Sequence, residues 1–297
     1  MTTPVDLRDA YAACERLATS HYENFPVASR LVPSRMRPHV AAIYAFARRA
    51  DDFADEGTLD PSDRHLRLDA WQEALHAAVD GRRVDTADAP LFHAVAHTIH
   101  THALPVGLFD DLLSAFHQDV DVSRYERWDD VMDYCRRSAN PVGRLVLRLA
   151  GVVDDDSDRD SDAVCTALQL ANFWQDFSVD WSRGRLYVPL EIVRREGADE
   201  RALEAGRFDA AWRRVAEVVV RETRRLFDRG RPVCGAVTGR LAWELRATWL
   251  GGTAILDKIE RAHFDVWSTR PTVGLVDAPR LVWRLLTWRA ATAPRVD

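Results

Sequence analysis

The stretch from Asn172 to Asp180 combines a helical spacing of polar side chains with an apolar face. Asn172, Asp176 and Asp180 recur every four residues, and residues four apart lie on one side of an α-helix. At about 100° per residue the three side chains span roughly 80° of arc. The opposite side carries Leu170, Trp174, Phe177 and Trp181. The pattern predicts one helix that packs through its aromatic face and lines a cavity or groove with its polar strip.

This polar strip favours a cation. Two carboxylates four residues apart repel each other by a few tenths of a kcal/mol in water, and by more where water is excluded. A bound cation would therefore stabilise the strip if it is buried. The alternative that the residues leave open is a solvated acidic face without a ligand.

A second polar strip lies on a helix predicted to start at Pro38 and to end at Gly57. Its members fall within about 60° of one another on the helix. The strip consists of Tyr44, Arg48, Asp51 and Asp55, with Asp52 at its edge. Apolar residues flank it on both sides, as expected for a helix that lines a cavity.

The rest of the chain also predicts helices. They cover residues 5–22, 38–56, 61–79, 89–103, 106–117, 129–150 with an interruption near Pro141, 208–230, 237–263 and 279–290, and a further one begins at Pro189. No convincing alternation typical of strands, no internal repeat and no long linker is present. A chain of 297 residues with 47% hydrophobic content can bury a large core. We therefore predict a single all-α domain over residues 1–297.

Composition narrows the partners and the compartment. The net charge of −6 and the absence of long basic runs argue against nucleic acid. Four cysteines far apart fit reduced thiols in a cytoplasmic protein, and neither a signal peptide nor an 18-residue apolar run occurs. The segment from Arg280 to Arg289 is basic and aromatic. It predicts a packing helix, with peripheral contact at the inner face of a membrane as the alternative.

Two other clusters imitate metal sites. The acidic run from Asp154 to Asp162 lacks the glycine and the bidentate glutamate of an EF-hand, which predicts a solvated loop that caps the next helix. His93, His97 and His100 share a helical face, but no His-Glu-x-x-His motif or associated cysteine accompanies them. A structural or surface role is expected for these histidines.

The two acidic strips remain as the candidate functional site, because the chain has no dinucleotide fingerprint, Walker sequence or nucleophile elbow. Asp and Asn oxygens suit Mg²⁺, which bridges readily to phosphate oxygens. If the ligand is a diphosphate, Mg²⁺ would neutralise the leaving group with help from Arg48 and Arg185. An aromatic cavity would then shield a carbocation from water.

From His21 to about residue 263 the chain resembles the squalene/phytoene synthase family. The matching motifs are Tyr44-x-x-x-Arg48-x-x-Asp51-Asp52-x-x-Asp55, Asn172-x-x-x-Asp176-x-x-x-Asp180 and Arg185-Leu-Tyr187-Val-Pro189. The resemblance implies an isoprenoid-synthase bundle whose two acid-bearing helices face each other across a central cavity. It also implies six Mg²⁺ ligands, Asp51, Asp52, Asp55, Asn172, Asp176 and Asp180. Arg48, Arg185 and Tyr187 would bind the substrate diphosphate, and Tyr44 and Arg48 would act in catalysis.

One motif departs from the squalene and phytoene synthases, which usually resemble Tyr-Cys-x-x-Val-Ala-Gly-x-Val-Gly where this chain has Tyr134-Cys-Arg136-Arg137-Ser138-Ala-Asn140-Pro141-Val-Gly143. With the segments Glu23–Ser29 and Asn172–Asp176, this variant is similar to bacterial hydroxysqualene synthases of hopanoid biosynthesis. Those enzymes ionise presqualene diphosphate and let water trap the rearranged cation. We expect Arg137 and Asn140 to position that water.

Two other functions stay open at this stage. A head-to-head synthase would make presqualene diphosphate, squalene or phytoene from farnesyl or geranylgeranyl diphosphate. A non-catalytic prenyl-binding or assembly subunit would keep the fold without the reaction. The resemblance also makes a presqualene diphosphate synthase a candidate partner.

Overall fold

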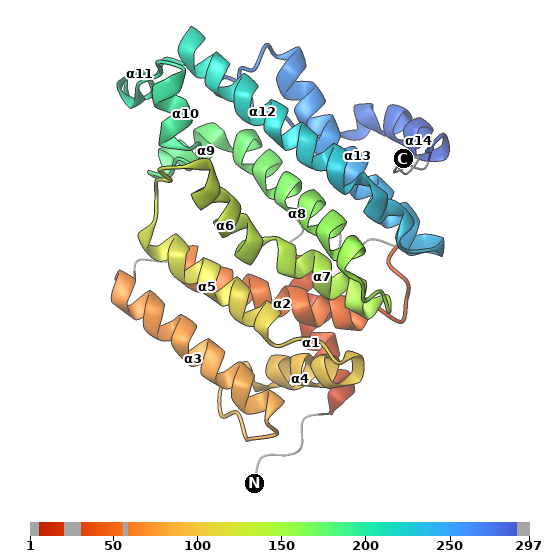
Figure 1. The fold of residues 1–297 in the computed structure, drawn as a ribbon. Coiled ribbons are helices and arrows are strands. Elements are labelled where there is room, and N and C mark those ends of the chain that lie inside the picture. Colours follow the sequence, from red (N-terminus) through yellow and green to blue (C-terminus); the bar gives the residue numbers. More distant parts are fainter. Residues whose placement is uncertain (1–5, 21–30, 56–58, 290–297) are drawn as a thin grey trace. The chain divides into compact units, whose positions relative to one another are not determined.

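The computed structural model describes residues 6–20, 31–55 and 59–289 (Figure 1). These ranges are helical with short connections and contain no strand; one isolated bridge pairs Arg124 with Leu186. The all-α prediction is confirmed. The chain divides into two compact units, Met1–Asp121 with Arg144–Val153, and Val122–Gly143 with Asp154–Asp297. The prediction of one domain over residues 1–297 stays a prediction.

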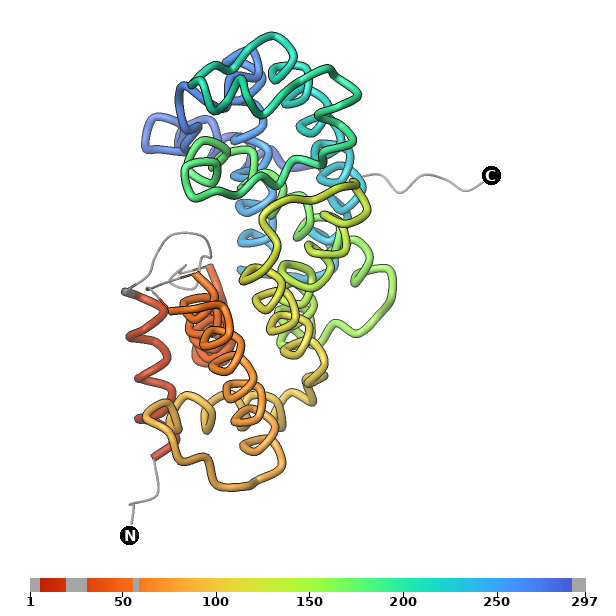
Figure 2. Tube along the Cα trace, turned by 90° about the vertical axis from the view of Figure 1, so that its left-hand side faces the viewer, coloured from red at the N-terminus to blue at the C-terminus, as the bar shows by residue number. Residues whose placement is uncertain are grey.

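The first unit is built around α2. Its helices are α1 (Leu7–Ser20), α2 (Arg37–Asp55), α3 (Pro61–Val79), α4 (Ala89–His102) and α5 (Gly107–Asp121). α2 packs against the other four, and the red α1 lies beside it (Figure 2). Fully buried Phe46 of α2 contacts three rings, with centroids 5.8 Å from Trp71, 6.4 Å from Phe92 and 5.4 Å from Phe109. One side of α2 is therefore core, which leaves another side for its polar strip.

Helix boundaries in this unit follow the predicted punctuation. Pro38 lies in the first turn of α2, and Pro61 begins α3 after the extended Asp60. α4 ends where Ala103 adopts a left-handed φ of 49° and donates its N–H to the carbonyl of Ile99. The predicted end of α2 at Gly57 and the motif Glu23–Ser29 lie outside the described residues.

The second unit is organised around α8 (Asp155–Gln175), which contacts α6, α9, α12, α13 and η1. The other elements are α6 (Trp128–Ser138), α9 (Phe177–Ser182), α10 (Leu190–Arg195), α11 (Glu200–Glu204), α12 (Ala210–Gly230), η1 (Arg231–Gly235), α13 (Gly239–Arg261), η2 (Leu275–Asp277) and α14 (Ala278–Leu286). The boundary between the units falls inside α7 (Asn140–Leu149).

Two contacts show how closely α8 and α12 approach each other. Trp174 of α8 donates its indole N–H to Thr223 Oγ1 of α12 at 2.8 Å. At the end of α12, a Cβ added to Gly230 would lie 2.4 Å from the carbonyl oxygen of Asp160 and 2.8 Å from the backbone nitrogen of Val164. Only glycine fits there without moving the α8 backbone.

The acidic run at the start of α8 is helix rather than loop. Asp154 caps the helix, since its Oδ1 accepts the N–H of Ser157 at 2.8 Å. The residues from Asp155 to Asp162 form the first turns of α8, so the predicted solvated loop is wrong beyond the cap. Acidic side chains are stabilised at a helix N-terminus by the helix dipole, which explains why the run is helical.

The cysteines and the absence of a membrane-spanning segment were both predicted from the sequence. All four cysteines are free, as expected for reduced thiols. Burial raises the pKa of Cys14 and of Cys234 to about 12 and that of Cys165 to about 11. In the described part of the chain, no helix combines the length and the apolar character needed to cross a membrane.

Candidate functional site

The polar strip predicted on α2 forms an ion-paired row. Arg48 joins both neighbouring acids, with Nη1 3.3 Å from Asp51 Oδ2 and Nη2 2.8 Å from Asp52 Oδ1. Offsets of three and four residues place these side chains on one helical face. Asp52 is the more sheltered acid, with 16% of its side chain exposed against 36% for Asp51. Tyr44 is partly buried one turn earlier, and Asp55 is exposed at the helix end.

The second predicted strip crosses a helix break. α8 ends at Gln175, Asp176 takes φ −98° and ψ 10°, and α9 begins at Phe177. The expectation of one continuous helix from Asn172 to Asp180 is therefore wrong, since aspartate favours helix ends over interiors. The spacing of the strip survives, because the Asp176 N–H donates to the Asn172 carbonyl at 2.9 Å and the Asp180 N–H donates to the Asp176 carbonyl at 2.8 Å.

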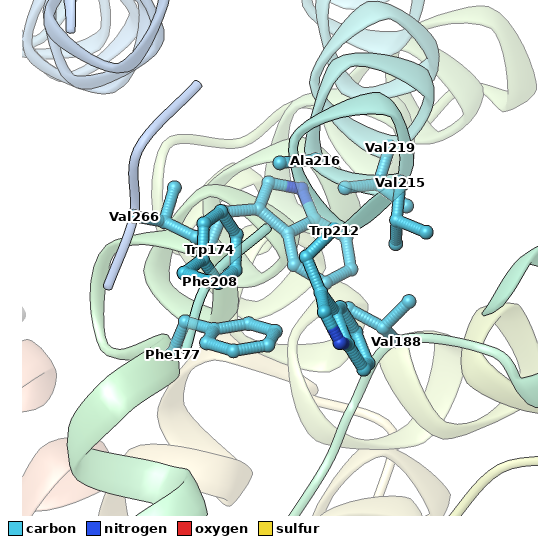
Figure 3. A pocket seen from close by; sticks show the side chains of 9 residues that line it. All are labelled: Trp174, Phe177, Val188, Phe208, Trp212, Val215, Ala216, Val219 and Val266. Carbon is cyan, nitrogen blue, oxygen red and sulfur yellow. The ribbon is translucent and has the colours of Figure 1, made fainter. Parts of the chain in front are cut away.

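The apolar side of the same stretch packs as predicted through three of its four residues. Leu170, Trp174 and Phe177 are at most 5% exposed. Trp174 and Phe177 line a small apolar pocket with Val188, Phe208, Trp212, Val215, Ala216, Val219 and Val266 (Figure 3). Trp181 differs: it is only partly buried and lies under the guanidinium of Arg124, 5.2 Å from the ring centroid. The buried apolar side thus holds the α8–α9 junction in place on the side opposite the polar strip.

Two donors hold the carboxylate of Asp176. Arg270 Nε donates to Oδ1, and Asn172 Nδ2 donates to Oδ2 at 2.9 Å. Arg270 lies in the loop between α13 and η2, where the next carbonyl, that of Pro271, accepts from Gln175 Nε2 at 2.7 Å. Our sequence reasoning missed Arg270. No spacing rule relates positions 94 residues apart, and no local motif marks this arginine.

Arg185 and Tyr187 lie in the loop after α9 and are tied to the same region. The Arg185 N–H donates to the Asp180 carbonyl at 2.9 Å, and Gly184 supplies the positive φ of 80° that this turn needs. The Tyr187 ring stacks on Phe173 of α8, with centroids 3.7 Å apart and planes 5° apart. Both predicted diphosphate-binding residues are therefore positioned by α8 and α9.

Arg137 and Asn140 lie at the corner between α6 and α7, where Ala139 separates the helices. Asn140 is 7% exposed, and its Oδ1 accepts from Thr166 Oγ1 of α8 at 2.9 Å. Arg137 donates from Nε and Nη2 to Asp133 Oδ2, at 3.1 and 2.9 Å. Burial raises the pKa of Asp133, but hydrogen bonds from Arg137 and the preceding arginine outweigh burial and leave that pKa below its ordinary value.

The donor chemistry of both strips fits Mg²⁺. All six predicted ligands offer carboxylate or amide oxygens, which a hard cation prefers, and none is a histidine or cysteine. Within the described residues, no three His, Cys, Asp or Glu side chains are already arranged to hold a metal ion. Arginines contact carboxylates in both strips, at Asp51 and Asp52 through Arg48 and at Asp176 through Arg270. A cation would have to compete with these ion pairs.

The three histidines on α4 have other contacts. His97 Nδ1 lies 2.9 Å from the Tyr11 hydroxyl, and His100 Nε2 lies 3.0 Å from the carbonyl oxygen of Val79. His93 is exposed. These contacts are those of the structural or surface role that we expected.

Comparison with known proteins decides the family. The sequence matches the squalene/phytoene synthase family over residues 18–284. The chain belongs to the squalene/phytoene synthase family. Members of this family process prenyl diphosphates, so the protein is an enzyme of isoprenoid biosynthesis.

The relatives of this squalene/phytoene synthase include members with different products. A hydroxysqualene synthase of Zymomonas mobilis is 38% identical over 72% of this chain and 71% of its own length. A phytoene synthase of Arthrospira platensis is 27% identical over 92% of this chain and 91% of its own. The crystal structure of squalene synthase HpnC from Alicyclobacillus acidocaldarius is 43% identical, with a TM-score of 0.81 over 88% of this chain and 97% of that one. The isoprenoid-synthase fold is therefore shown.

Proposed function

We propose that this enzyme is an Mg²⁺-dependent hydroxysqualene synthase, which converts presqualene diphosphate and water to hydroxysqualene and diphosphate in hopanoid biosynthesis. The observation that carries the proposal is the α6–α7 corner. At the position of Asn140, the pattern of the squalene and phytoene synthases usually has a glycine. The Asn140 side chain is buried and hydrogen-bonded to Thr166. The 38% identity to a hydroxysqualene synthase supports the same branch.

Bound Mg²⁺ would supply positive charge to the leaving diphosphate, which lowers the cost of breaking the carbon–oxygen bond. In the first unit, Asp51, Asp52 and Asp55 are the ligands we propose. In the second unit they are Asn172, Asp176 and Asp180. The Arg48 and Arg270 guanidiniums, now paired with carboxylates of these strips, would turn to diphosphate oxygens once those carboxylates bind a cation. Arg185 and Tyr187 would contact diphosphate oxygens of the substrate, and Tyr44 would act beside Arg48.

In the proposed reaction, heterolysis of the carbon–oxygen bond leaves its electron pair on diphosphate and produces a carbocation, which rearranges. A water oxygen then forms the new carbon–oxygen bond and loses a proton, which gives the alcohol. Water must therefore reach an otherwise apolar site at one position. The Ser138 hydroxyl, between Arg137 and Asn140, is buried without a hydrogen-bond partner among the described residues. A buried, unsatisfied hydroxyl beside polar neighbours is suited to hold a water molecule.

The test is incubation with Mg²⁺ and either presqualene diphosphate or farnesyl diphosphate, followed by mass spectrometry of the extract. Hydroxysqualene from presqualene diphosphate, dependent on Mg²⁺, is the expected result. Conversion of farnesyl diphosphate to presqualene diphosphate, squalene or phytoene would replace the proposal with a head-to-head synthase, an alternative favoured by the likeness to phytoene synthase. A partner that supplies presqualene diphosphate follows from the proposed substrate. Co-purification with a presqualene diphosphate synthase would test that association.

A further inference from the structure

The short helix α14 turns its charged side to the protein and its apolar side to solvent. Val282, Trp283 and Leu286 are 53%, 67% and 66% exposed, and Leu275 and Val276 in the preceding η2 are 93% and 89% exposed. We name Val273, Leu275, Val276, Val282, Trp283 and Leu286 the apolar C-terminal face. These six make up most of the large hydrophobic residues exposed in the described ranges. A helix at the surface of a globular protein normally turns such side chains towards the core.

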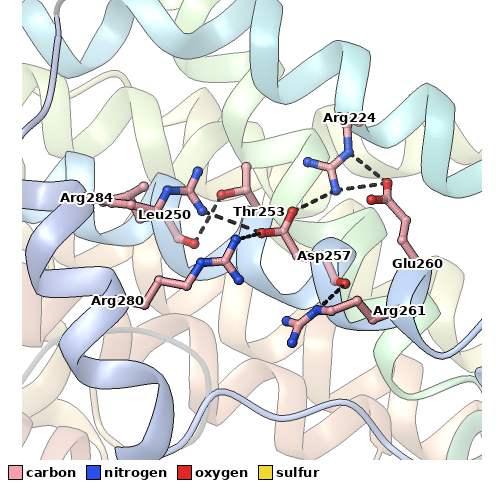
Figure 4. A network of polar contacts seen from close by, with 8 residues as sticks. All are labelled: Arg224, Leu250, Thr253, Asp257, Glu260, Arg261, Arg280 and Arg284. Carbon is pink, nitrogen blue, oxygen red and sulfur yellow. Dashed lines mark hydrogen bonds and ion pairs between the residues drawn. The ribbon is translucent and has the colours of Figure 1, made fainter.

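Ion pairs on the other side of α14 fix this orientation. Arg280 and Arg284 are one helical turn apart, and both reach Asp257 Oδ2 of α13, at 3.1 and 3.5 Å (Figure 4). Just before α14, Lys258 binds Asp277 Oδ2 at 2.7 Å. Because the basic side of the helix is held on α13, its apolar side faces away from α13.

The charge around this face indicates which partner covers it. The polar network beside α14 is basic even with its ion pairs counted, because four arginines, Arg224, Arg261, Arg280 and Arg284, meet two acids, Asp257 and Glu260 (Figure 4). The whole chain, in contrast, has a net charge of −6. Two copies of such a network would repel each other, whereas an anionic surface would attract each of them. Trp283, which is 67% exposed, belongs to the side-chain type that is enriched at the boundary between lipid and water.

We propose that the apolar C-terminal face docks on the surface of a bilayer that contains anionic lipids. Val282, Trp283 and Leu286 would enter the boundary between headgroups and acyl chains, and the exposed Arg289 would lie at the level of the lipid phosphates. This docking needs no membrane-spanning helix. It goes beyond the reaction proposed above and does not depend on it.

The experiment is sedimentation with vesicles of phosphatidylcholine, with and without phosphatidylglycerol, in the absence of substrate. The wild-type protein is expected to pellet with the anionic vesicles, and less at high salt. The double variant Trp283→Glu/Leu286→Glu is expected to bind at least about tenfold more weakly, because it removes apolar surface and adds negative charge. Leu66→Glu on α3 is the matched control: Leu66 is 65% exposed but lies elsewhere, and its variant should bind as wild type.

Several outcomes would overturn the proposal. Binding by the double variant equal to wild type, or wild-type protein that ignores anionic vesicles, would show that this face does not dock on lipid. A wild-type dimer in light scattering that the double variant converts to monomer would show that a second copy covers the face. Circular dichroism checks that the double variant is folded, and the milder Trp283→Ser carries the test if it is not. No step requires turnover, so failure of the proposed reaction would leave the result intact.

Discussion

The guanidinium of Arg270 is hydrogen-bonded to the carboxylate of Asp176, which lies at the break between α8 and α9. A carboxylate expected to bind a cation is thus already neutralised by one from the protein itself. Because an arginine cannot lose its proton under ordinary conditions, only displacement frees this oxygen for Mg²⁺. Arg270 therefore links metal binding at Asp176 to the loop between α13 and η2.

We predict that Arg270→Gln separates metal binding from catalysis. Without the competing guanidinium, Mn²⁺ titrated in the absence of substrate should bind more tightly to the variant. Turnover at saturating Mg²⁺ should nevertheless fall by about tenfold to a hundredfold, the effect of losing one or two charge-assisted hydrogen bonds to diphosphate. Arg221→Gln, at an exposed position on α12, is the control and should change neither quantity. Weaker Mn²⁺ binding by Arg270→Gln would contradict the competition.

Replacement of single carboxylates should greatly reduce Mg²⁺-dependent turnover. Asp51→Asn and Asp176→Asn each remove a charge from a different strip, and each is expected to reduce Mg²⁺-dependent turnover by about a hundredfold or more. Asp156→Asn is the control, because Asp156 lies on α8 with 85% of its side chain exposed. Full activity of either test variant would remove that residue from the proposed site.

The Thr166 hydroxyl should influence the product through Asn140. Thr166→Val keeps the shape of the side chain but removes the donor that holds Asn140 Oδ1. If the amide helps to place the trapping water, the hydroxylated fraction of the product should fall relative to unhydroxylated hydrocarbons, while substrate binding stays similar. Asn140→Ala and Arg137→Tyr should act in the same direction. Mass spectrometry of the extract measures the ratio, and an unchanged ratio in all three variants would refute this role.

Gly230→Ala should destabilise the second unit. The added methyl group would meet the backbone of α8 at Asp160, where neither helix can shift without disturbing its hydrogen bonds. Overpacking of this kind costs about 1–3 kcal/mol in the free energy of unfolding. Gly235→Ala is the control, since no described neighbour lies within 4 Å of the point that its added Cβ would occupy and its φ is not positive, so a change below about 0.5 kcal/mol is expected. Urea unfolding of both variants measures the difference.

The protein should become less stable as the pH falls, because His39 resists protonation in the folded state. Burial, with added repulsion from His102 and His97, lowers the pKa of His39 from 6.5 to about 4. Between these pH values the unfolded chain takes up a proton that the folded protein refuses, so stability is present above pH 6.5 and decreases as the pH falls towards 4. In His39→Gln, the decrease in the free energy of unfolding over this pH range should be smaller by roughly 1 kcal/mol, after solvent screening is allowed for. Unfolding at several pH values provides the measurement; parallel curves for the two proteins would exclude His39.

The sequence predicted what depends on local periodicity. The buried face of Leu170, Trp174 and Phe177 and the ion-paired row around Arg48 both follow from positions three or four residues apart. The break at Asp176 was not predicted, because a small change in ψ ends a helix without altering its spacing pattern. Contacts such as that of Arg270 depend on how a distant loop returns to a helix end, which no periodicity encodes.

Lys258 gives the protein an unusual chemical property. It is the only lysine side chain in the sequence, and it holds the carbonyl of Thr272 at 2.6 Å and Asp277 at 2.7 Å. An amine-selective reagent therefore has one side-chain target, at the base of the loop that leads into η2 and α14. The rate at which this amine is labelled should report how often the loop detaches from α13, without any engineered probe.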